Sequence, residues 1–268
     1  MPSSIRATAG AGPVVTKADI ARGLAAVGLR GGDVVLVHAS LSAFGHVAGG
    51  ADIVIDALLD AVGSGGTVVV PTFTWDSFHD KSGGVFDVRE TPSEVGRITE
   101  VFRQRPQAIR SPHICHSVAA IGPHAAELTA DTPSAYGPGS PFDRLVDLDA
   151  WNLFLGVSFT SCTALHAVEE WMQVPYRQFR DFLDSTVIHA DGHRAPSTAV
   201  EYLRKPGFWN DFAKMDAVFA QHGVLRTAVV GKATLTNVRI RDIVRIARRC
   251  LSEDICFLLG DACRPAAV

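Results

Sequence analysis

A histidine and a glutamate three residues apart, His166 and Glu169, stand where an apolar strand passes through a polar turn into a helix. The strand is expected at Asn152–Val157, and the helix begins with His166 in its first turn. On a helix, residues three apart share one face, so the carboxylate lies beside the imidazole. A histidine oriented by a carboxylate is a general base that works near neutral pH. The same spacing also fits an ordinary first helical turn that Thr163 caps and a solvated glutamate completes.

Other reactive side chains follow two further predicted strands at the point where each strand ends. His38 and the hydroxyls of Ser40 and Ser42 follow the first strand, and the run Thr72–Asp76 follows the second. In open α/β sheets, ligands bind at the carboxyl ends of the strands. Together with the segment that carries His166, these strand ends bring two histidines, an acid and several hydroxyls to one rim.

Two other chemistries fit residues in the same segments. A divalent metal could bind His166 and Glu169, since the spacing His-x-x-Glu on a helix suits such an ion. His113 and His116 would add ligands, but the chain lacks the Cys-x-x-Cys and His-Glu-x-x-His patterns of common metal sites. Cys162 could be a nucleophile that the helix N-terminus activates, but nothing else marks it, and an inert packing or loop cysteine fits this position better. We expect no bound metal and an inert cysteine.

The composition is that of a globular protein, and it narrows the class of partner. Of the 268 residues, 47% are hydrophobic and 20% are charged, enough for one large domain. A formal net charge of −3 provides no basic field for nucleic acid. Five scattered cysteines indicate reduced thiols rather than a disulfide framework. The N-terminal residues lack a secretory signal, and no apolar run reaches membrane-spanning length. We therefore expect a cytoplasmic protein that binds neither nucleic acid nor membrane.

Helix and strand signals alternate along most of the chain. Thr16 is the expected N-cap of a helix over Lys17–Val27, and Gly28 is its expected end. The pair Gly49-Gly50 opens a second helix. The order strand, helix, strand requires a parallel pair of strands with a right-handed crossover. The remaining expected elements are strands at Asp33–His38, Thr67–Pro71, Val118–Ile121 and Ile255–Leu259 and helices at Glu94–Gln104 and Leu235–Leu251.

Residues 176–225 differ from the rest of the chain because they are rich in aromatic and charged side chains. The dipeptide Asp191-Gly192 marks a hairpin turn within them. We expect an inserted substrate-side subdomain of a hairpin plus a helix. The predicted organisation is a flexible arm over residues 1–14 and a single α/β domain over residues 15–268. Its central sheet is mostly parallel and is flanked by helices.

Five segments agree with the motifs of one enzyme family, in the order in which that family has them. They are residues 35–45 (VLVHASLSAFG), 65–72 (GGTVVVPT), 111–120 (SPHICHSVAA), 137–142 (GPGSPF) and 155–169 (LGVSFTSCTALHAVE). The chain resembles the aminoglycoside 3-N-acetyltransferases, which are acetyl-CoA-dependent antibiotic acetyltransferases unrelated in fold to the GNAT enzymes. The resemblance runs through most of residues 15–180 and weakens beyond them.

The resemblance implies an acyltransferase that uses acetyl-CoA as co-substrate and holds no metal. The family's catalytic base corresponds to His166, with Glu169 as its orienting carboxylate, and His38 also lines the active site. The positive end of the helix lowers the pKa of His166 and Glu169 raises it, so we expect a value near neutrality. Hydroxyl-rich loops and backbone N–H groups suit the phosphates and pantetheine arm of coenzyme A. The expected cofactor contacts are Ser40, Leu41, Ser42, Thr72, Ser111, His116 and Ser117. Backbone groups of the Ser40–Leu41 loop and the Thr72 hydroxyl are also the expected oxyanion donors.

The implied acceptor is the 3-amino group of an aminoglycoside, to which the acetyl group passes directly. A polycation needs carboxylates and aromatic faces. The expected substrate contacts are Asp76, Trp75, Glu201 and Asp211, and Asp80, Asp87, Phe73, Phe78 and Trp209 are also available. The run Ser158–Cys162 lacks the proline and the Asp or Asn that aminoglycoside-inactivating members tend to carry there, so a different amine is an alternative acceptor.

Two further alternatives lie outside this activity. One is a thioester hydrolase or acyltransferase that depends on Cys162, and the other is a protein that binds coenzyme A or an amine without catalysis. We expect a small-molecule amine as the partner and a monomer or homodimer as the assembly.

Overall fold

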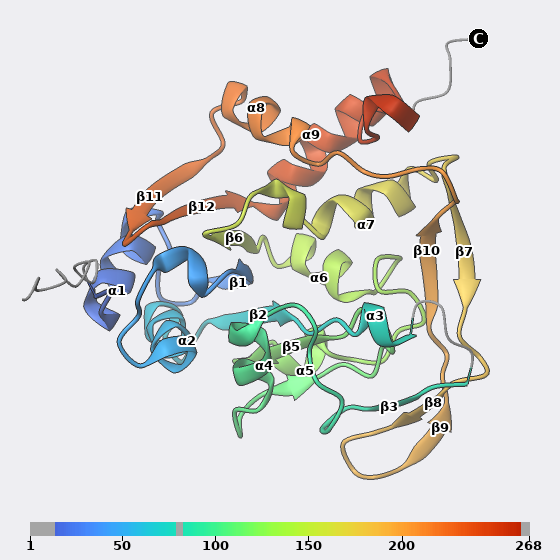
Figure 1. Cartoon of the computed structure of the whole chain (residues 1–268), viewed down its shortest axis with the longest axis horizontal. Helices are drawn as coiled ribbons and strands as arrows, with labels where there is room; N and C mark the ends of the chain where they lie inside the picture. The colour runs from blue at the N-terminus through green and yellow to red at the C-terminus, as the bar shows by residue number, and fades with distance from the viewer. Residues whose placement is uncertain (1–13, 79–82, 264–268) are drawn as a thin grey trace, which may run out of the picture.

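The centre of the fold is a seven-stranded sheet with helices on both faces (Figure 1). The structure is a computed structural model that describes residues 14–78 and 83–263. From one edge to the other, the strands are β11 (Arg226–Val230), β12 (Ala233–Arg239), β6 (Trp151–Leu155), β1 (Val34–Ala39), β2 (Thr67–Pro71), β5 (Val118–Ile121) and β4 (Ile109–Arg110).

Strands β6, β1 and β2 run parallel and form the middle of this sheet. On either side of this centre, β12 pairs antiparallel with β6 and β5 pairs antiparallel with β2. At the edges, β11 pairs antiparallel with β12 and β4 with β5. The predicted α/β fold with a mostly parallel centre is confirmed, and only the flanks reverse direction. Because parallel strands end at the same edge, the residues that follow Ala39, Pro71 and Leu155 come together there.

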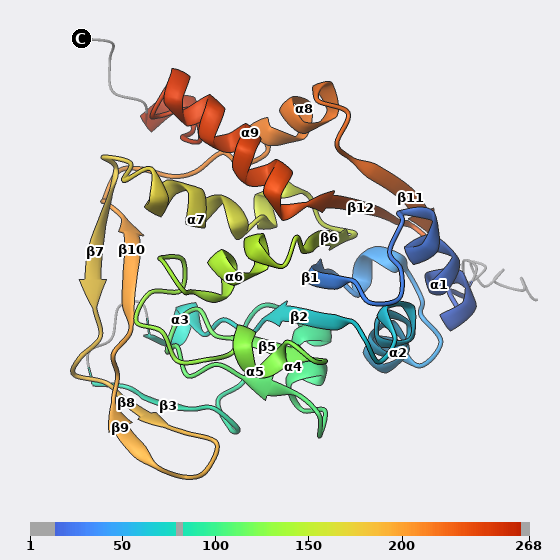
Figure 2. The same cartoon turned by 180° about the vertical axis from the view of Figure 1, so that it is seen from behind.

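Two helical layers cover the sheet because its central strands bury side chains on both faces. In β1, Val35 and Val37 pack into one hydrophobic cluster and Val34 and Leu36 into the other, as alternation along a strand requires. Fully burying each such side chain is worth about 1.5–3 kcal/mol. The first layer holds α1 (Lys17–Ala26), α2 (Gly50–Val62) and α4 (Arg97–Arg103). The second, seen well in Figure 2, holds α5 (Ala125–Leu128), α6 (Pro141–Asp147), α7 (Ala164–Trp171), α8 (Lys214–Gln221) and α9 (Ile240–Glu253).

Several element boundaries lie where local sequence signals predict them. Thr16 caps α1 through a capping box, in which its hydroxyl accepts from Asp19 N at 3.3 Å and the Asp19 carboxylate accepts from Thr16 N at 2.9 Å. Gly49 precedes α2 and Gly50 is its first residue. Their φ values of 84° and 63° lie in a backbone region that favours glycine. Strand β2 spans the predicted residues.

Residues 176–225 form strands β7 to β10 and helix α8, mostly at one end of the molecule (Figure 1). Strands β7 (Arg177–Asp181) and β10 (Val200–Arg204) pair antiparallel. Strands β8 (Thr186–Ile188) and β9 (Arg194–Pro196) form the hairpin predicted at Asp191-Gly192, and β3 (Val85–Asp87) joins β8 in parallel. The short helix α3 (Trp75–Phe78) follows β2 on the same side. This region therefore contains more strand than the predicted hairpin and helix.

The end of the chain differs from the sequence prediction in two places. The predicted helix Leu235–Leu251 is wrong in its first five residues, which belong to β12; α9 begins only at Ile240. Alternate residues Leu235 and Asn237 are fully buried there, because β12 pairs with strands on both sides. The predicted strand Ile255–Leu259 is also wrong. These residues form turns. A short apolar run that packs into a core has no periodicity, so the sequence alone does not distinguish a strand from turns there.

Part of the sequence prediction falls outside the described residues, namely residues 1–13 of the expected arm and Asp80. Val14, the last residue of that arm, is 48% exposed, whereas Val15 is buried and bridges to Val47. Within the part of the chain that the structure describes, no helix combines the length and apolarity needed to cross a membrane.

Candidate active site

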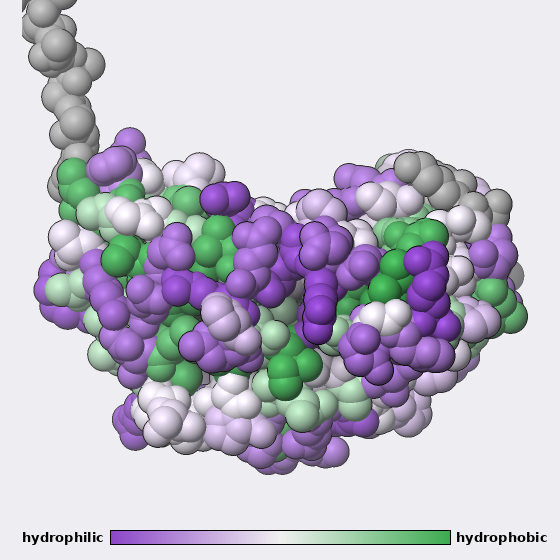
Figure 3. Space-filling view, turned by 90° about the horizontal axis from the view of Figure 1, so that it is seen from below, coloured by the Kyte–Doolittle hydropathy of each residue, from purple (hydrophilic) through white to green (hydrophobic). Residues whose placement is uncertain are grey.

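A cavity of about 560 Å³ opens where the three parallel strands end. The cavity is lined by His38 and Ala39 at the end of β1, by Pro71 at the end of β2 and Phe73 just beyond it, and by the turn that leads from β6 to His166. Seen from below, the molecule is hollowed between its two ends (Figure 3). The strand ends that the sequence singled out therefore face one cavity.

His166 and Glu169 are paired in the first turns of α7, as their spacing predicts. Nδ1 of His166 lies 2.8 Å from Oε2 of Glu169, whose side chain has no exposed surface. Oε2 can only accept, so its bond to the ring is made in the tautomer with the proton on Nδ1, which leaves the lone pair on Nε2 of an imidazole that is 28% exposed. In that tautomer Nη2 of Arg177, which can only donate, bonds to Oε2 of Glu169 and not to Nδ1. Thr163 stands at the N-cap but makes no capping hydrogen bond with its side chain, so the alternative of an ordinary capped turn is wrong.

Three residues that the sequence did not single out complete this pair. Nη2 of Arg177 lies 2.8 Å from Oε2 of Glu169 and 2.9 Å from Nδ1 of His166. The Tyr176 hydroxyl and Nδ2 of Asn210 donate to Oε1 of the same carboxylate at 2.9 and 2.5 Å. Arg177 also donates to Asn210 Oδ1 at 2.9 Å. The buried carboxylate is thus fully hydrogen-bonded. The only feature of the sequence that could have indicated these partners is that Tyr176 and Arg177 lie in the segment after α7.

This environment sets the charge of His166. Burial, and after it the Arg177 cation, lowers the pKa of His166 to about 4, although the bond to Glu169 acts in the opposite direction. For Glu169, burial raises the pKa, but Arg177 and His166 outweigh it and hold the pKa below its usual value. The pKa of His166 lies below the near-neutral value expected from the sequence, chiefly because the ring is buried and then because Arg177 lies beside it. At pH 7 the imidazole is neutral and the carboxylate ionised.

Replacing Arg177 by methionine is expected to move the acid limb of the kcat/KM profile upward. In the wild type this limb lies near pH 4, because protonation of His166 below its pKa removes the base. Without the cation, burial still lowers the pKa of His166, but the second lowering cause is gone while Glu169 still raises the pKa, so it rises from about 4 toward its ordinary value. A pH series with one acceptor measures the shift. The exposed Arg194 serves as the control (Arg194→Met), and an unmoved limb in the Arg177 variant would contradict the assignment.

His38 lies in the cavity wall as predicted. Its ring is 4% exposed and stacks on Phe154 with centroids 5.3 Å apart. Burial lowers the pKa of His38 to about 3, so the ring stays neutral. Its Nε2 atom has no hydrogen-bond partner among the described residues.

The Ser40–Ser42 loop lines a second groove that continues from this cavity. Ala39 and Val95 border both, and Gly50 and Arg97 lie farther along the groove. Ser40 Oγ and Ser42 Oγ are 3.1 Å apart. The N–H of Ser40 already donates to Leu155 O at 2.9 Å, so it is not an oxyanion donor. The N–H of Leu41 has no acceptor within the described residues.

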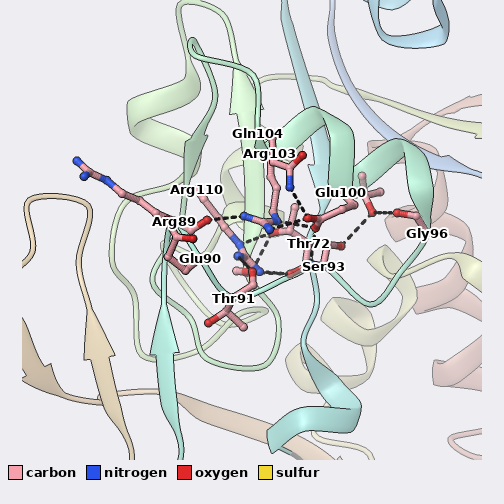
Figure 4. A network of polar contacts seen from close by, with 12 residues as sticks. Thr72, Arg89, Glu90, Thr91, Ser93, Gly96, Glu100, Arg103, Gln104 and Arg110 are labelled. Carbon is pink, nitrogen blue, oxygen red and sulfur yellow. Dashed lines mark hydrogen bonds and ion pairs between the residues drawn. The ribbon is translucent and has the colours of Figure 1, made fainter. Parts of the chain in front are cut away.

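Three of the expected cofactor contacts lie away from the cavity. Thr72 and Ser117 have no exposed surface, and their hydroxyls bond each other at 2.8 Å. Nε of Arg110 donates to Thr72 Oγ1 at 3.1 Å, in the polar network that Figure 4 shows. Ser111 is 2% exposed and accepts from Val118 N at 3.0 Å. The hydroxyls of Thr72, Ser111 and Ser117 are thus engaged in hydrogen bonds that connect β2, β4 and β5. The structure therefore does not support Thr72 as an oxyanion donor or these three residues as contacts to coenzyme A.

The expected substrate contacts are divided between the cavity and its surroundings. Trp75 lines the cavity, as does His116 from the expected cofactor set. Glu201 is 1% exposed and lies behind His116 rather than in the wall. Asp76 is exposed outside the cavity, and Asp211 lies outside it 3.8 Å from Lys214 Nζ. Among the additional candidates, Phe73 lines the cavity, whereas Asp87, Phe78 and Trp209 do not.

Cys162 borders the cavity but is 1% exposed. Burial raises the pKa of its thiol to about 12, which disfavours the thiolate that a nucleophile needs. Across the described residues, no group of three or more His, Cys, Asp or Glu side chains is arranged to hold a metal ion. The geometry therefore favours base chemistry at His166 over a cysteine nucleophile.

Comparison with known proteins agrees with this geometry. The family model described as aminoglycoside 3-N-acetyltransferase matches residues 36–252. The chain is 38% identical to aminoglycoside N(3)-acetyltransferase VII of Streptomyces paromomycinus over 201 residues, which cover 68% of this chain and 69% of that protein. It is 32% identical to aminoglycoside N(3)-acetyltransferase III of Enterobacter cloacae over 261 residues, 85% of this chain and 88% of that one.

Solved structures extend the similarity to nearly the whole chain. The apoenzyme of aminoglycoside acetyltransferase AAC(3)-IVa has a TM-score of 0.77 and 27% identity, with 95% of this chain and 97% of that chain covered. The binary complex of AAC-IIIb with CoASH has a TM-score of 0.76 and 26% identity over 90% of this chain and 97% of that chain. From its sequence, fold and site, the chain belongs to the aminoglycoside 3-N-acetyltransferase family of acyltransferases.

Proposed function

We propose that this protein transfers the acetyl group of acetyl-CoA directly to the 3-amino group of an aminoglycoside, with His166 as the general base. The observation that carries the proposal is the contact of His166 Nδ1 with the buried Glu169 carboxylate at 2.8 Å, on a ring that lines the cavity at the ends of the parallel strands. The names of the relatives support the acceptor class. A structure of AAC(3)-IVa in complex with apramycin (TM-score 0.73, 28% identity) supports it as well.

The proposed reaction needs one proton acceptor on the amine side. Nε2 of His166 takes the proton of the amine as its nitrogen attacks the thioester carbonyl carbon. The tetrahedral intermediate collapses by breaking the carbon–sulfur bond, and the thiolate receives the proton from His166, so the products are an amide and free coenzyme A. Glu169 stabilises the transient imidazolium without taking the proton itself. The N–H of Leu41 is our candidate oxyanion donor, because the N–H of Ser40 and the Thr72 hydroxyl are already bonded.

The donor is proposed to bind along the groove of the Ser40–Ser42 loop. This groove joins the cavity and is lined by Gly50 at the start of the 13-residue helix α2 and by Arg97 at the start of α4. Helix N-termini and an arginine suit the phosphates of coenzyme A. The structure of AAC-IIIb with CoASH, a neighbour of the same fold, supports coenzyme A as the donor.

The acceptor is proposed to bind in the cavity itself, on the side that residues 176–225 build. Arg177 and the segment Tyr202–Phe208 come from that region and line the cavity. Aromatic rings of Phe73, Trp75 and Tyr136 form the opposite part of the wall and suit a sugar face or a cation. We infer on this ground that residues 176–225 are the substrate-side part of a single domain.

A thiol-release assay with acetyl-CoA and a panel of aminoglycosides and simple amines tests the proposal. Release of coenzyme A with an aminoglycoside, and mass and NMR evidence for an acetamide at its 3-amino position, is the expected result. Turnover with another amine while every aminoglycoside fails would keep the base mechanism and overturn the acceptor. Ligand binding without thiol release from any amine would establish the non-catalytic alternative.

Replacing Cys162 by alanine is expected to leave turnover nearly unchanged, because its buried thiol is protonated across the working pH range. The same assay measures kcat, and intact-protein mass spectrometry after quenching detects an acetylated enzyme. The buried Cys256, outside the cavity, provides the matched control (Cys256→Ala). Loss of activity in the Cys162 variant together with an acetyl-enzyme in the wild type would instead establish the cysteine-dependent mechanism.

A further inference from the structure

A second histidine with a carboxylate behind it faces the same cavity. Nδ1 of His116 contacts Oε1 of Glu201 on β10, and the two side chains are 13% and 1% exposed. Nδ1 is buried, and its contact with Oε1 is an ionic approach whose geometry is not that of a hydrogen bond. Because the carboxylate has no proton, Nδ1 carries the proton in the neutral ring and Nε2 has the lone pair. No hydrogen bond to Nε2 is formed within the described residues, and His116 lines the cavity. The lone pair of Nε2 is therefore directed at the cavity.

Aromatic rings hold the His116 imidazole in place. Its centroid lies 4.7 Å from that of Phe73, 5.4 Å from Trp75 and 5.2 Å from Tyr136. Tyr136 in turn lies 5.8 Å from the ring of His166. The two imidazoles thus flank one tyrosine ring, and both line the same cavity.

Two of the imidazoles in the cavity wall, those of His116 and His166, each have a carboxylate behind them, and the wall itself offers a ligand no carboxylate. Among the described residues that line it, none is Asp or Glu, while Arg177, Arg204 and Lys205 are cations. Glu169 and Glu201 each lie one layer behind a histidine. Burying a carboxylate is costly unless it is paired, so the contact with His116 gives Glu201 a partner as it orients the ring. An N–H or O–H group of a ligand in this cavity meets the lone pairs of the histidines rather than a carboxylate.

We propose that His116 accepts a hydrogen bond from a second N–H or O–H group of the acceptor and so determines specificity. The preferred substrates are then amines that carry an ammonium or hydroxyl group on the same ring as the reacting amine. This inference rests on the proposed acetyl transfer at His166. His116 is the group that touches the substrate, and Glu201 is a positioning residue that acts through it. His116 thereby moves from the expected coenzyme A contacts to the acceptor side.

A matched pair of acceptors tests this role in the full-length protein. Cyclohexylamine and a diaminocyclohexane differ only in the second amine, and kcat and KM are measured for each with acetyl-CoA. The wild type is expected to prefer the diamine, and His116→Phe to lower that preference about 10- to 100-fold, chiefly through KM for the diamine. The KM for acetyl-CoA is expected to stay constant. His116→Gln, which keeps an acceptor oxygen, should restore part of the preference. The exposed His193 is the matched control (His193→Phe).

A second variant and a second measurement keep the test decisive. Glu201→Gln preserves shape but no longer requires Nδ1 to donate, so it should reduce the preference as well, with a melting temperature that shows a folded protein. Calorimetric binding of both amines without acetyl-CoA reports the preference independently of turnover. Equal affinities in the wild type, an unchanged ratio in both variants, or a raised KM for acetyl-CoA alone would overturn the role of His116. Absence of thiol release with a binding preference intact would refute the proposed function and leave the recognition role standing.

Discussion

Replacing His166 by alanine is expected to lower kcat by about 10²- to 10⁴-fold, while the affinity for acetyl-CoA stays unchanged. The amine loses a proton as its nitrogen attacks the thioester, and Nε2 of His166, on the ring that Glu169 orients, is the proposed acceptor of that proton. Alanine offers no acceptor at that place. The proposed donor groove lies along the Ser40–Ser42 loop and does not include His166. Thiol release at saturating substrates measures kcat, and calorimetry measures acetyl-CoA binding.

The control for this variant is His222→Ala, at the exposed end of α8, which should behave as the wild type. Turnover that survives in the His166 variant would remove His166 from the role of base. Loss of acetyl-CoA binding would assign it to the donor site instead. Both measurements are therefore needed on the same preparation.

Replacing Glu169 by alanine is expected to lower the free energy of unfolding by about 3–5 kcal/mol and to lower kcat as well. The carboxylate accepts from Tyr176 and Asn210 and contacts His166 and Arg177. Without it, a guanidinium whose side chain is 6% exposed lacks its ionic partner, and the imidazole loses the group that determines its tautomer. Urea unfolding at pH 7 measures the first effect, and thiol release measures the second.

The matched control is Glu253→Ala, which removes an exposed i,i+4 pair with Arg249 on α9. Such a pair is worth at most about 1 kcal/mol. A Glu169 variant with no greater loss of stability than this control would contradict the picture of a buried, fully bonded carboxylate. Glu169→Gln separates the two effects, because the amide can still accept from Tyr176 but carries no charge.

Much of the sheet could be predicted because buried strands have a local signature. The β-branched run that ends at His38 and the run Thr67–Pro71 are both buried, and the latter matches β2 at both ends. The capping box at Thr16 likewise depends on residues within one turn. At Leu235, in contrast, the sequence prediction was wrong, because the pairing of β12 with β11 and β6 outweighs helical periodicity.

The candidate site divides in the same way. The contact of His166 with Glu169 spans three residues and could be predicted. The position of His38 in the cavity wall could also be predicted, because the residue lies at the end of a strand. The hydroxyls of Thr72 and Ser117 were expected at the site. They instead bond each other and accept from Nε of Arg110, away from the cavity. Glu201 was expected as a substrate carboxylate, yet His116 covers it.

By itself, the sequence determined the central strands, the starts of helices such as α1 and α2, and the pairing of His166 with Glu169, because each depends on neighbours within about one helical turn or one strand. Only the tertiary structure decided the electrostatic environment of His166 and the identity of the groups that line the cavity. Arg177 lies 11 residues from His166, and Asn210 lies 41 residues from Glu169. Both effects require groups brought together by folding, since burial and nearby charge shift a pKa through space rather than along the chain.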